Sequence, residues 1–268
     1  MFAPTDQFLA MIRLRTIMTK ISKPKLAIYD FTDCEGCEVQ LVSLLEDFLK
    51  LEKRVEIVNW RLGQEHNHTG PFDVCIIEGT PITLLEQKLL KELRAKSKIL
   101  VGLGACATLG GVPAIITKQK RNEMYKKVYG AGYRPRGLDS LPLNHYVPVD
   151  YMIHGCPADR GDILRSLTDL LAGKMPAHLP YPVCLECKLA GPECRLLNEK
   201  PCLGSVSQAG CNAVCVKGGT GCYGCRGSVT GANWVSLHKT LQNFMTKDEI
   251  KKFASVFLSA TKEYKNLK

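Results

Sequence analysis

The sequence lacks several features that would place a protein in a membrane or outside the cell. No apolar run is long enough to cross a bilayer, and the longest ones, such as Ile99–Leu103, have the length of a strand. The first residues contain neither the continuous apolar stretch of a secretory signal nor the adjacent arginine pair of twin-arginine export. We therefore expect a cytoplasmic protein without a membrane span. A reducing compartment counts against structural disulfides.

Familiar catalytic motifs are missing as well. The sequence has no Ser–His–Asp arrangement, no phosphate-binding loop and no G-x-G-x-x-G motif after its first expected strand. The fragment Gly102-Leu103-Gly104 is too short to indicate a dinucleotide site. No group for bond-making chemistry on an organic substrate is visible, so we expect no catalytic residue on this chain. This pattern favours a protein that conducts electrons.

Acidic residues are outnumbered: 36 Lys and Arg face 26 Asp and Glu, for a formal net charge of +10. Such a balance can indicate nucleic-acid binding. The basic residues are spread over expected helices, as in Lys118–Arg121 and Lys247–Lys252, and exposed aromatic residues are not interleaved with them. Thiolate-bound clusters would also offset part of the positive charge. We expect no nucleic-acid partner.

Cysteine, by contrast, is abundant. Eight of the 13 cysteines lie between residues 184 and 225, a stretch called here the cysteine segment. They form two blocks of four, C-x2-C-x6-C-x7-C (Cys184, Cys187, Cys194, Cys202) and C-x3-C-x6-C-x2-C (Cys211, Cys215, Cys222, Cys225). Four thiolates can bind a [4Fe-4S] cluster or a tetrahedral zinc ion. The segment is rich in glycine and poor in apolar residues, so we expect an inorganic centre to hold it together. Zinc and iron–sulfur fit these residues equally well, and disulfides fit them less well.

An alternation of strands and helices precedes this segment. Strands are expected at Lys25–Phe31, Val55–Trp60, Phe72–Glu78, Lys98–Leu103 and Val149–Ile153. Helices are expected at Glu38–Leu51, Leu84–Ala95, about 121–129 and about Ala158–Leu171. This order predicts an α/β fold, a flavodoxin-like doubly wound parallel sheet with helices on both faces.

A third set of four cysteines directly follows the expected strands. Cys34 and Cys37 follow the first strand, Cys106 the fourth and Cys156 the fifth. The carboxyl ends of parallel strands meet at one edge of a sheet, so these thiols are expected to converge on another four-ligand site. Cys75 lies in the middle of a strand instead, where a free cysteine is usually a small buried apolar residue.

The remaining features complete the expected organisation. After residue 231 the chain is expected to be helical, with Thr246 as the N-cap of the last long helix. Trp234 and Phe257 are expected in the core, with a face for a partner as the alternative. His66 and His68 are assigned to a solvated loop, and His154 either to a loop or to a hydrogen bond near a metal centre. The expected parts are a flexible lead (1–23), a flavodoxin-like domain (24–175), a two-cluster domain (176–231) and C-terminal helices (232–268).

The motifs around the first four cysteines resemble those of [NiFe] hydrogenase small subunits. They are Cys34-Glu35-Gly36-Cys37, Gly104-Ala105-Cys106 with Gly110-Gly111, and Gly155-Cys156-Pro157. Ala158 stands where that family has a second proline, which leaves the ligand intact. The resemblance covers about Lys25 to Gly231. It implies that Cys34, Cys37, Cys106 and Cys156 hold the proximal [4Fe-4S] cluster, next to the nickel–iron centre of a large partner subunit.

The cysteine segment resembles the cytoplasmic, multi-subunit branch of this family. That branch includes the archaeal sulfhydrogenases and the methyl-viologen-reducing hydrogenases, and their delta-type subunits are the most similar. Membrane-bound uptake enzymes carry a histidine where Cys184 stands. The resemblance implies two further [4Fe-4S] clusters, one on each block of four cysteines. An exchange of Cys202 and Cys211 between the two clusters is left open.

The implied function is electron relay in a hydrogenase whose hydrogen-activating site lies on the large subunit. A further partner with flavin or iron–sulfur clusters is expected to exchange electrons with this chain, and its final acceptor is left open. Glu35 and Glu38 are candidates for proton traffic, for contact with the large subunit, or simply for a helix N-terminus. One alternative is the cluster-bearing subunit of NADH:quinone oxidoreductases, which is similar over the α/β domain only. Another is a zinc-stabilised scaffold.

Overall fold

The computed structural model describes residues 23–267, so nearly all of the expected lead at 1–23 lies outside the described residues. The strands are β1 (Lys25–Asp30), β2 (Glu56–Trp60), β3 (Phe72–Glu78), β4 (Ser97–Leu103) and β5 (Tyr151–Ile153). The helices of the sheet region are α2 (Gly36–Val42), α3 (Glu46–Glu52), α4 (Leu84–Lys96), α5 (Gly104–Leu109), α6 (Lys118–Tyr129) and α7 (Arg160–Leu171). The later helices are α8 (Val183–Ala190), α9 (Val214–Lys217), α10 (Trp234–Gln242), α11 (Lys247–Leu258) and α12 (Lys262–Lys265). Short 3₁₀ turns are η1 (Val112–Ile115), η2 (Leu143–His145) and η3 (Leu196–Asn198).

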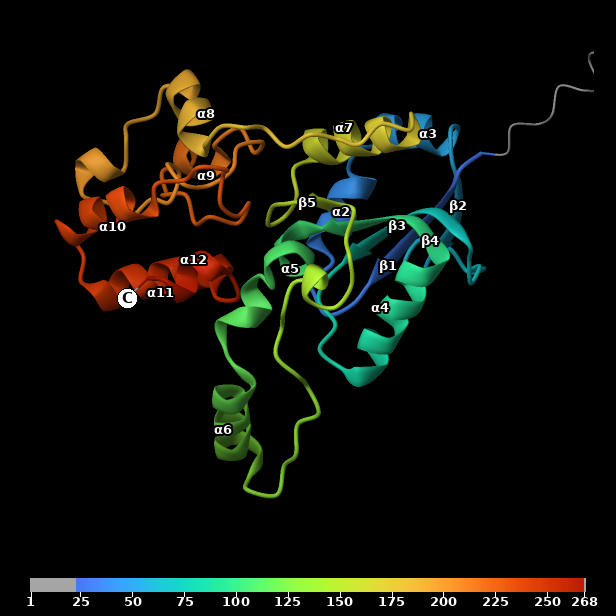
Figure 1. The fold of residues 1–268 in the computed structure, drawn as a ribbon, viewed down its shortest axis with the longest axis horizontal. Helices are drawn as coiled ribbons and strands as arrows, with labels where there is room; N and C mark the ends of the chain where they lie inside the picture. The colour runs from blue at the N-terminus through green and yellow to red at the C-terminus, as the bar shows by residue number, and fades with distance from the viewer. Residues whose placement is uncertain (1–22, 268) are drawn as a thin grey trace, which may run out of the picture.

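All five strands form one parallel sheet in the order β2-β1-β3-β4-β5. Five strands were expected at these places, and the flavodoxin-like order confirms the predicted fold class. Each strand was foreseeable because its apolar run is bounded by turn residues or by a helical pattern. The parallel arrangement brings the loops after β1, β4 and β5 to one edge of the sheet (Figure 1).

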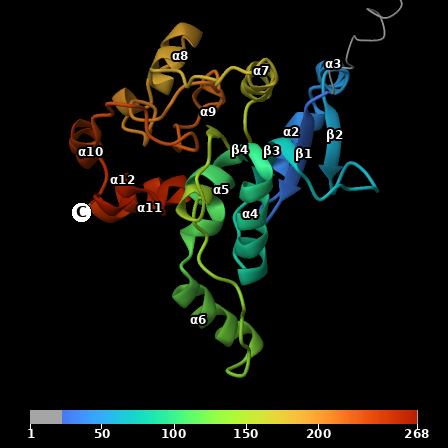
Figure 2. The same cartoon turned by 45° about the vertical axis from the view of Figure 1, so that its right-hand side comes forward.

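Helices cover both faces of the sheet. Helices α2, α3 and α7 lie on one face and α4 on the other (Figures 1 and 2). Successive strand residues point to opposite faces, so Leu26 and Ile28 of β1 join the core under α2 and α7, while Ala27 joins the core under α4. Two apolar cores therefore fix the sheet on both sides and hold its carboxyl edge in place.

The helix expected at Glu38–Leu51 is in fact two shorter helices, α2 and α3, and that prediction was wrong about continuity. The chain bends at Leu45, which has a φ of 52°. Leu41 and Leu51 are buried on the two sides of the bend, and Phe48 packs against the same core. The apolar spacing marked the buried face correctly, but it could not show the bend.

The cysteine segment and the preceding Val183 form only a small core, which consists of Val183, Cys202, Ala213, Val216 and Cys222. A larger core joins the three parts of the chain: Leu109 of α5, Leu203 of the cysteine segment, and Ile250 and Leu258 of α11. Trp234 and Phe257 pack against this core, as expected. The C-terminal helices thus brace the junction between the sheet and the cysteine segment. Helix α6 projects away from the body of the molecule (Figures 1 and 2).

Within residues 23–267, no helix combines the length and the apolar character needed to cross a membrane.

Candidate functional site

The four cysteines at the carboxyl edge of the sheet, called the sheet-edge group, lie on three loops that the fold brings together. They are Cys34, Cys37, Cys106 and Cys156. The pKa of Cys106 is raised to about 12, mainly by burial and in smaller part by the neighbouring Cys156 and Cys34 thiolates. Burial also raises the pKa of Cys156, again with a contribution from Cys34. Mutual effects of this kind require that the thiols lie close to one another.

Glycine lets the backbone approach these sulfurs. A Cβ on Gly104, which has a φ of +80°, would lie 2.4 Å from Cys37 Sγ. A Cβ on Gly111 would lie 3.0 Å from Cys106 Sγ. The backbone N–H of Ala158 donates a hydrogen bond to Cys37 Sγ at 3.5 Å. Sterics therefore explain why Gly104 and Gly111 are glycines, since a side chain at either position would occupy the space of a thiol.

Buried carboxyl groups surround the first loop, and sequence reasoning missed the most buried of them. Glu78, at the end of β3, accepts hydrogen bonds from the backbone N–H groups of Cys37 (3.0 Å) and Glu38 (2.7 Å). Its side chain is buried, and burial raises its pKa to about 7. Glu38 accepts a hydrogen bond from Trp60 Nε1 at 2.6 Å, and burial raises its pKa to about 7 as well. The one sequence signal that could have identified Glu78 as a site residue is its position at the end of a buried strand.

The first four cysteines of the cysteine segment are also neighbours, and they are called the α8 group because α8 carries Cys184 and Cys187. The pKa of Cys184 is raised to about 11, mainly by burial and in smaller part by the neighbouring Cys202, Cys187 and Cys194 thiolates. Cys202 Sγ accepts hydrogen bonds from the backbone N–H of Gly204 at 3.4 Å and of Cys222 at 3.3 Å. The sulfur of Cys202 thus lies between the two cysteine blocks.

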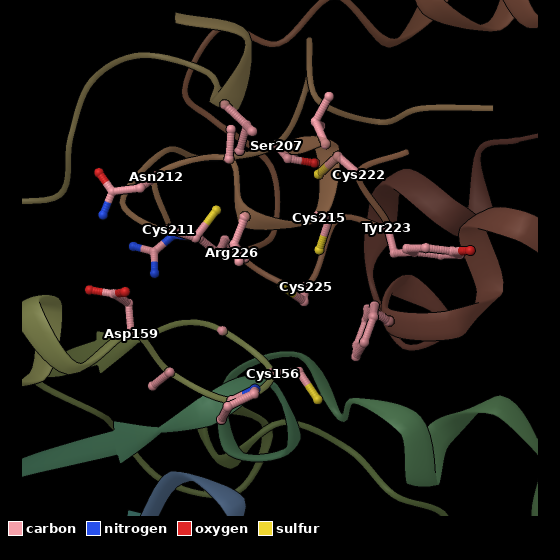
Figure 3. Close-up of a pocket in the computed structure, with 18 of the residues that line it drawn as sticks. Cys156, Asp159, Ser207, Cys211, Asn212, Cys215, Cys222, Tyr223, Cys225 and Arg226 are labelled. Carbon is pink, nitrogen blue, oxygen red and sulfur yellow. The ribbon is translucent and has the colours of Figure 1, made fainter. Parts of the chain in front are cut away.

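The last four cysteines line a cavity of about 560 Å³ and are called the cavity group. They are Cys211, Cys215, Cys222 and Cys225. Cys156 of the sheet-edge group lines the same cavity from the side of the sheet (Figure 3). The pKa of Cys225 is raised to about 12, mainly by burial and in smaller part by the neighbouring thiolates of Cys211, Cys215 and Cys156.

The cavity group also adjoins the α8 group. Burial raises the pKa of Cys222, and the nearby Cys202 and Cys225 thiolates contribute in the same direction. The Glu186 carboxylate, between the two cysteines of α8, accepts hydrogen bonds from the backbone N–H groups of Gly210 (2.7 Å) and Ala213 (3.3 Å). Glu186 therefore ties α8 to the loop of Cys211, a role that its sequence position did not reveal.

The remaining candidates lie apart from these groups or add no ligand. Cys75 is fully buried in β3, and burial raises its pKa to about 12, as expected for a structural thiol. His66 and His68 are exposed on a loop. Burial lowers the pKa of His154 to about 3, so its ring is neutral, and its Nδ1 atom is buried without a hydrogen-bond partner.

The donor set matches the chemistry of iron–sulfur clusters. Each group offers four thiols, and glycine backbone or N–H groups approach the sulfurs in the sheet-edge and α8 groups. Burial makes the free thiolates unfavourable, whereas bound iron would favour the deprotonated sulfurs. Among the side chains of residues 23–267, no three His, Cys, Asp or Glu are drawn together tightly enough to hold a single metal ion.

Known proteins share this sequence and this fold. A family model described as the 20 kDa subunit of NADH ubiquinone oxidoreductase matches residues 34–170. The delta subunit of sulfhydrogenase 2 from Pyrococcus furiosus is 39% identical over 228 residues, which are 84% of this chain and 95% of that protein. The chain belongs to this family, among its hydrogenase small subunits. The family model ends before the cysteine segment, so it covers only the α/β region of this chain.

Two further relatives agree with this assignment. One component of the F420-non-reducing hydrogenase vhu from Methanococcus voltae is 28% identical over 236 residues, which are 76% of this chain and 82% of that protein. Among solved structures, a chain of the NAD+-reducing [NiFe]-hydrogenase in its H2-reduced state superposes with a TM-score of 0.52 and 28% identity. The match covers 59% of this small subunit and 96% of that chain. The recognition of a [NiFe] hydrogenase small subunit from its motifs is confirmed, and the family together with the cysteines indicates iron–sulfur clusters.

Proposed function

We propose that this small subunit relays electrons between a [NiFe] large subunit and an electron-accepting partner through three [4Fe-4S] clusters. The sheet-edge group would hold the proximal cluster, and the cavity group and the α8 group would hold one cluster each. When bound, such clusters supply one-electron transfer at potentials set by burial and by hydrogen bonds to sulfur. The observation that carries the proposal is the continuity of the three groups. Cys156 shares a cavity with the cavity group, and Cys222 of that group lies beside Cys202 of the α8 group.

The chain's own residues prepare these sites in two ways. Backbone N–H groups of Ala158 and Gly204 point at the sulfurs of Cys37 and Cys202, where they would stabilise negative charge. The apolar cores on both sides of the sheet hold the three sheet-edge loops at fixed places. Loops that are held in place in this way would rearrange little when the charge of a bound cluster changes during electron transfer.

The face beside Cys34 supports a contact with the large subunit. Cys34 is exposed, and Val39, Val42 and Leu62 line a cavity of about 280 Å³ next to it, together with Glu35 and Trp60. The three aliphatic side chains, called the apolar rim, are 58%, 53% and 49% exposed. A group of half-exposed aliphatic residues beside an exposed ligand loop is typical of a protein interface. The proximal cluster would then lie at the shortest distance from the partner's nickel–iron site.

The proposal has further parts. The electron-transfer partner with flavin or iron–sulfur clusters rests on the resemblance to delta-type subunits, whereas the cytoplasmic location and the division of the chain at 24–175, 176–231 and 232–268 rest on sequence pattern. A role for Glu35 or Glu38 in proton traffic also belongs here. The burial of Glu38 and its bond to Trp60 favour a positional role for that carboxyl group.

The test is the nickel and iron content of the complex, purified anaerobically from its source. We expect about one nickel per copy of this chain and at least about 12 iron atoms, since each four-cysteine site would bind a four-iron cluster. Abundant iron without nickel would favour a quinone-oxidoreductase-like complex instead. Zinc in place of iron would leave only a scaffold role.

A further inference from the structure

Arg226 directly follows Cys225, and its guanidinium group lies in the protein interior. The residue is 3% exposed, and each of its three nitrogens donates a hydrogen bond. Nε donates to the carbonyl of Ala209 at 2.8 Å, and one terminal nitrogen donates to the carbonyl of His154 at 2.8 Å. The other terminal nitrogen forms an ion pair of 2.7 Å with the buried Asp162 carboxylate. All three nitrogens of the rigid, planar guanidinium therefore donate hydrogen bonds.

The two carbonyl acceptors occupy related places in the chain. His154 precedes Cys156 by two residues, and Ala209 precedes Cys211 by two residues. Together with Cys225, the guanidinium thus connects three cysteine loops that are distant in sequence. The three cysteines line the same cavity, Cys156 from the side of the sheet and the other two from the cysteine segment (Figure 3). One side chain joins the sheet-edge group to the cavity group.

The position of the guanidinium is defined by its surroundings. A Cβ on Gly210, which has a φ of +118°, would lie 2.4 Å from an Arg226 terminal nitrogen, so only glycine leaves room for it. Asp162 lies on α7, and it also pairs with Arg165, which orients its carboxylate. A buried ion pair is by itself weak evidence for stability, because desolvation offsets much of the attraction. The contacts are therefore better explained by the positions in which they hold the loops than by a gain in stability.

We propose that Arg226 is a positioning residue that fixes the separation and orientation of the sheet-edge group and the cavity group. The inference rests on the proposed function, in which these groups hold consecutive clusters of the electron path. Arg226 binds no cluster itself and acts through the backbone of the three loops. Lysine could not replace it, because an ammonium group is a compact charge without a planar fork that could bind three separate acceptors.

The test compares two variants of the complete complex, Arg226→Gln and Gly210→Ala, by iron content, by reduction potentials and by electron paramagnetic resonance of the reduced clusters. Arg226→Gln removes the fork, and Gly210→Ala displaces it while all ligands and charges remain. We expect both variants to retain their iron and to show an altered magnetic interaction between the two clusters. Hydrogen-dependent reduction of the acceptor should fall roughly 10- to 100-fold, as is typical for residues that orient metal ligands. Arg226→Lys should not restore the interaction.

Two controls match these changes. Arg94 also pairs with an aspartate and donates to several carbonyls, but it lies on α4, away from the cysteine loops. Gly219 also has a positive φ, +92°, but no atom lies within 4 Å of a Cβ there. Arg94→Gln and Gly219→Ala should leave the magnetic interaction unchanged.

Three outcomes would overturn the reasoning in distinguishable ways. Full iron with an unchanged magnetic interaction in Arg226→Gln and Gly210→Ala would refute the positioning role. Loss of iron from both variants, while Gly219→Ala keeps its iron, would mean that Arg226 serves to retain the clusters and not to set their spacing. A wild-type complex without iron would instead remove the proposed function on which the inference rests.

Discussion

The apolar rim offers the sharpest test of where the large subunit binds. Val39 lies in the middle of α2, is 58% exposed and lines the cavity beside Glu35. Complete burial of a valine contributes about 1.5 kcal/mol, so burial of its exposed part in an interface would contribute about 0.9 kcal/mol. Val39→Glu removes this contribution. It also places a carboxylate in an apolar contact, where an uncompensated charge costs about 3 kcal/mol.

The total of about 4 kcal/mol corresponds to a roughly thousandfold weaker complex. The measurement is the dissociation constant of the small and large subunits, determined by titration of one purified subunit with the other under anaerobic conditions. The matched control is Val128→Glu, which makes the same change at a valine that is 72% exposed on the projecting helix α6. Val128→Glu should leave the dissociation constant within a few-fold of the wild-type value.

Two results would contradict this reasoning. Wild-type affinity in Val39→Glu would place the large subunit on another face. An equal loss of affinity in Val39→Glu and Val128→Glu would show that α6 also belongs to the interface, or that the added charge acts at long range. Salt would separate these two explanations, because long-range attraction and repulsion are screened at high ionic strength.

Further predictions concern the ligands, a glycine and a helix cap. Cys222→Ser should remove about four iron atoms per chain and impair reduction of the acceptor, while hydrogen–deuterium exchange at the large subunit persists. Cys75→Ser should retain all of the iron, because Cys75 is buried in β3, away from the three groups. Gly104→Ala should also cost about four iron atoms, since its Cβ would lie 2.4 Å from Cys37 Sγ. Thr246→Ala should destabilise α11 by about 1 kcal/mol, because Thr246 and Glu249 form a capping box. The first three are measured by iron analysis, and the last by hydrogen exchange of the α11 amides.

These predictions can be contradicted or checked against control variants. If Cys222→Ser abolished exchange at the large subunit as well, the cysteine segment would be structural and not a conductor. Gly173→Ala, at a φ of +73° with no atom within 4 Å of the added Cβ, should keep the iron that Gly104→Ala loses. Thr246→Ser retains the hydroxyl acceptor, so it should protect the α11 amides as the wild type does.

Local sequence pattern was enough to predict that the cysteines of the sheet-edge group lie at one edge of the sheet. The strands were predictable because apolar runs alternate with helical periodicity, and parallel strands must end at one edge. Cys34, Cys106 and Cys156 could therefore be grouped although more than 120 residues separate the first from the last. The bend at Leu45 could not be foreseen, because the same apolar face continues on both sides of it.

The sequence by itself determined the flavodoxin-like α/β fold, and it predicted three sets of four thiols with an exchange of Cys202 and Cys211 left open. The fold follows from the alternation of apolar and helical periodicity, and the thiol sets follow from residue type and spacing, all of which are local features of the chain. Only the tertiary structure decided which groups meet. It brought Glu78 to the backbone of Cys37, Cys156 into the cavity of the last four cysteines, and Arg226 to the carbonyls of His154 and Ala209. Such contacts depend on sheet register and loop paths, and no spacing along the chain records them.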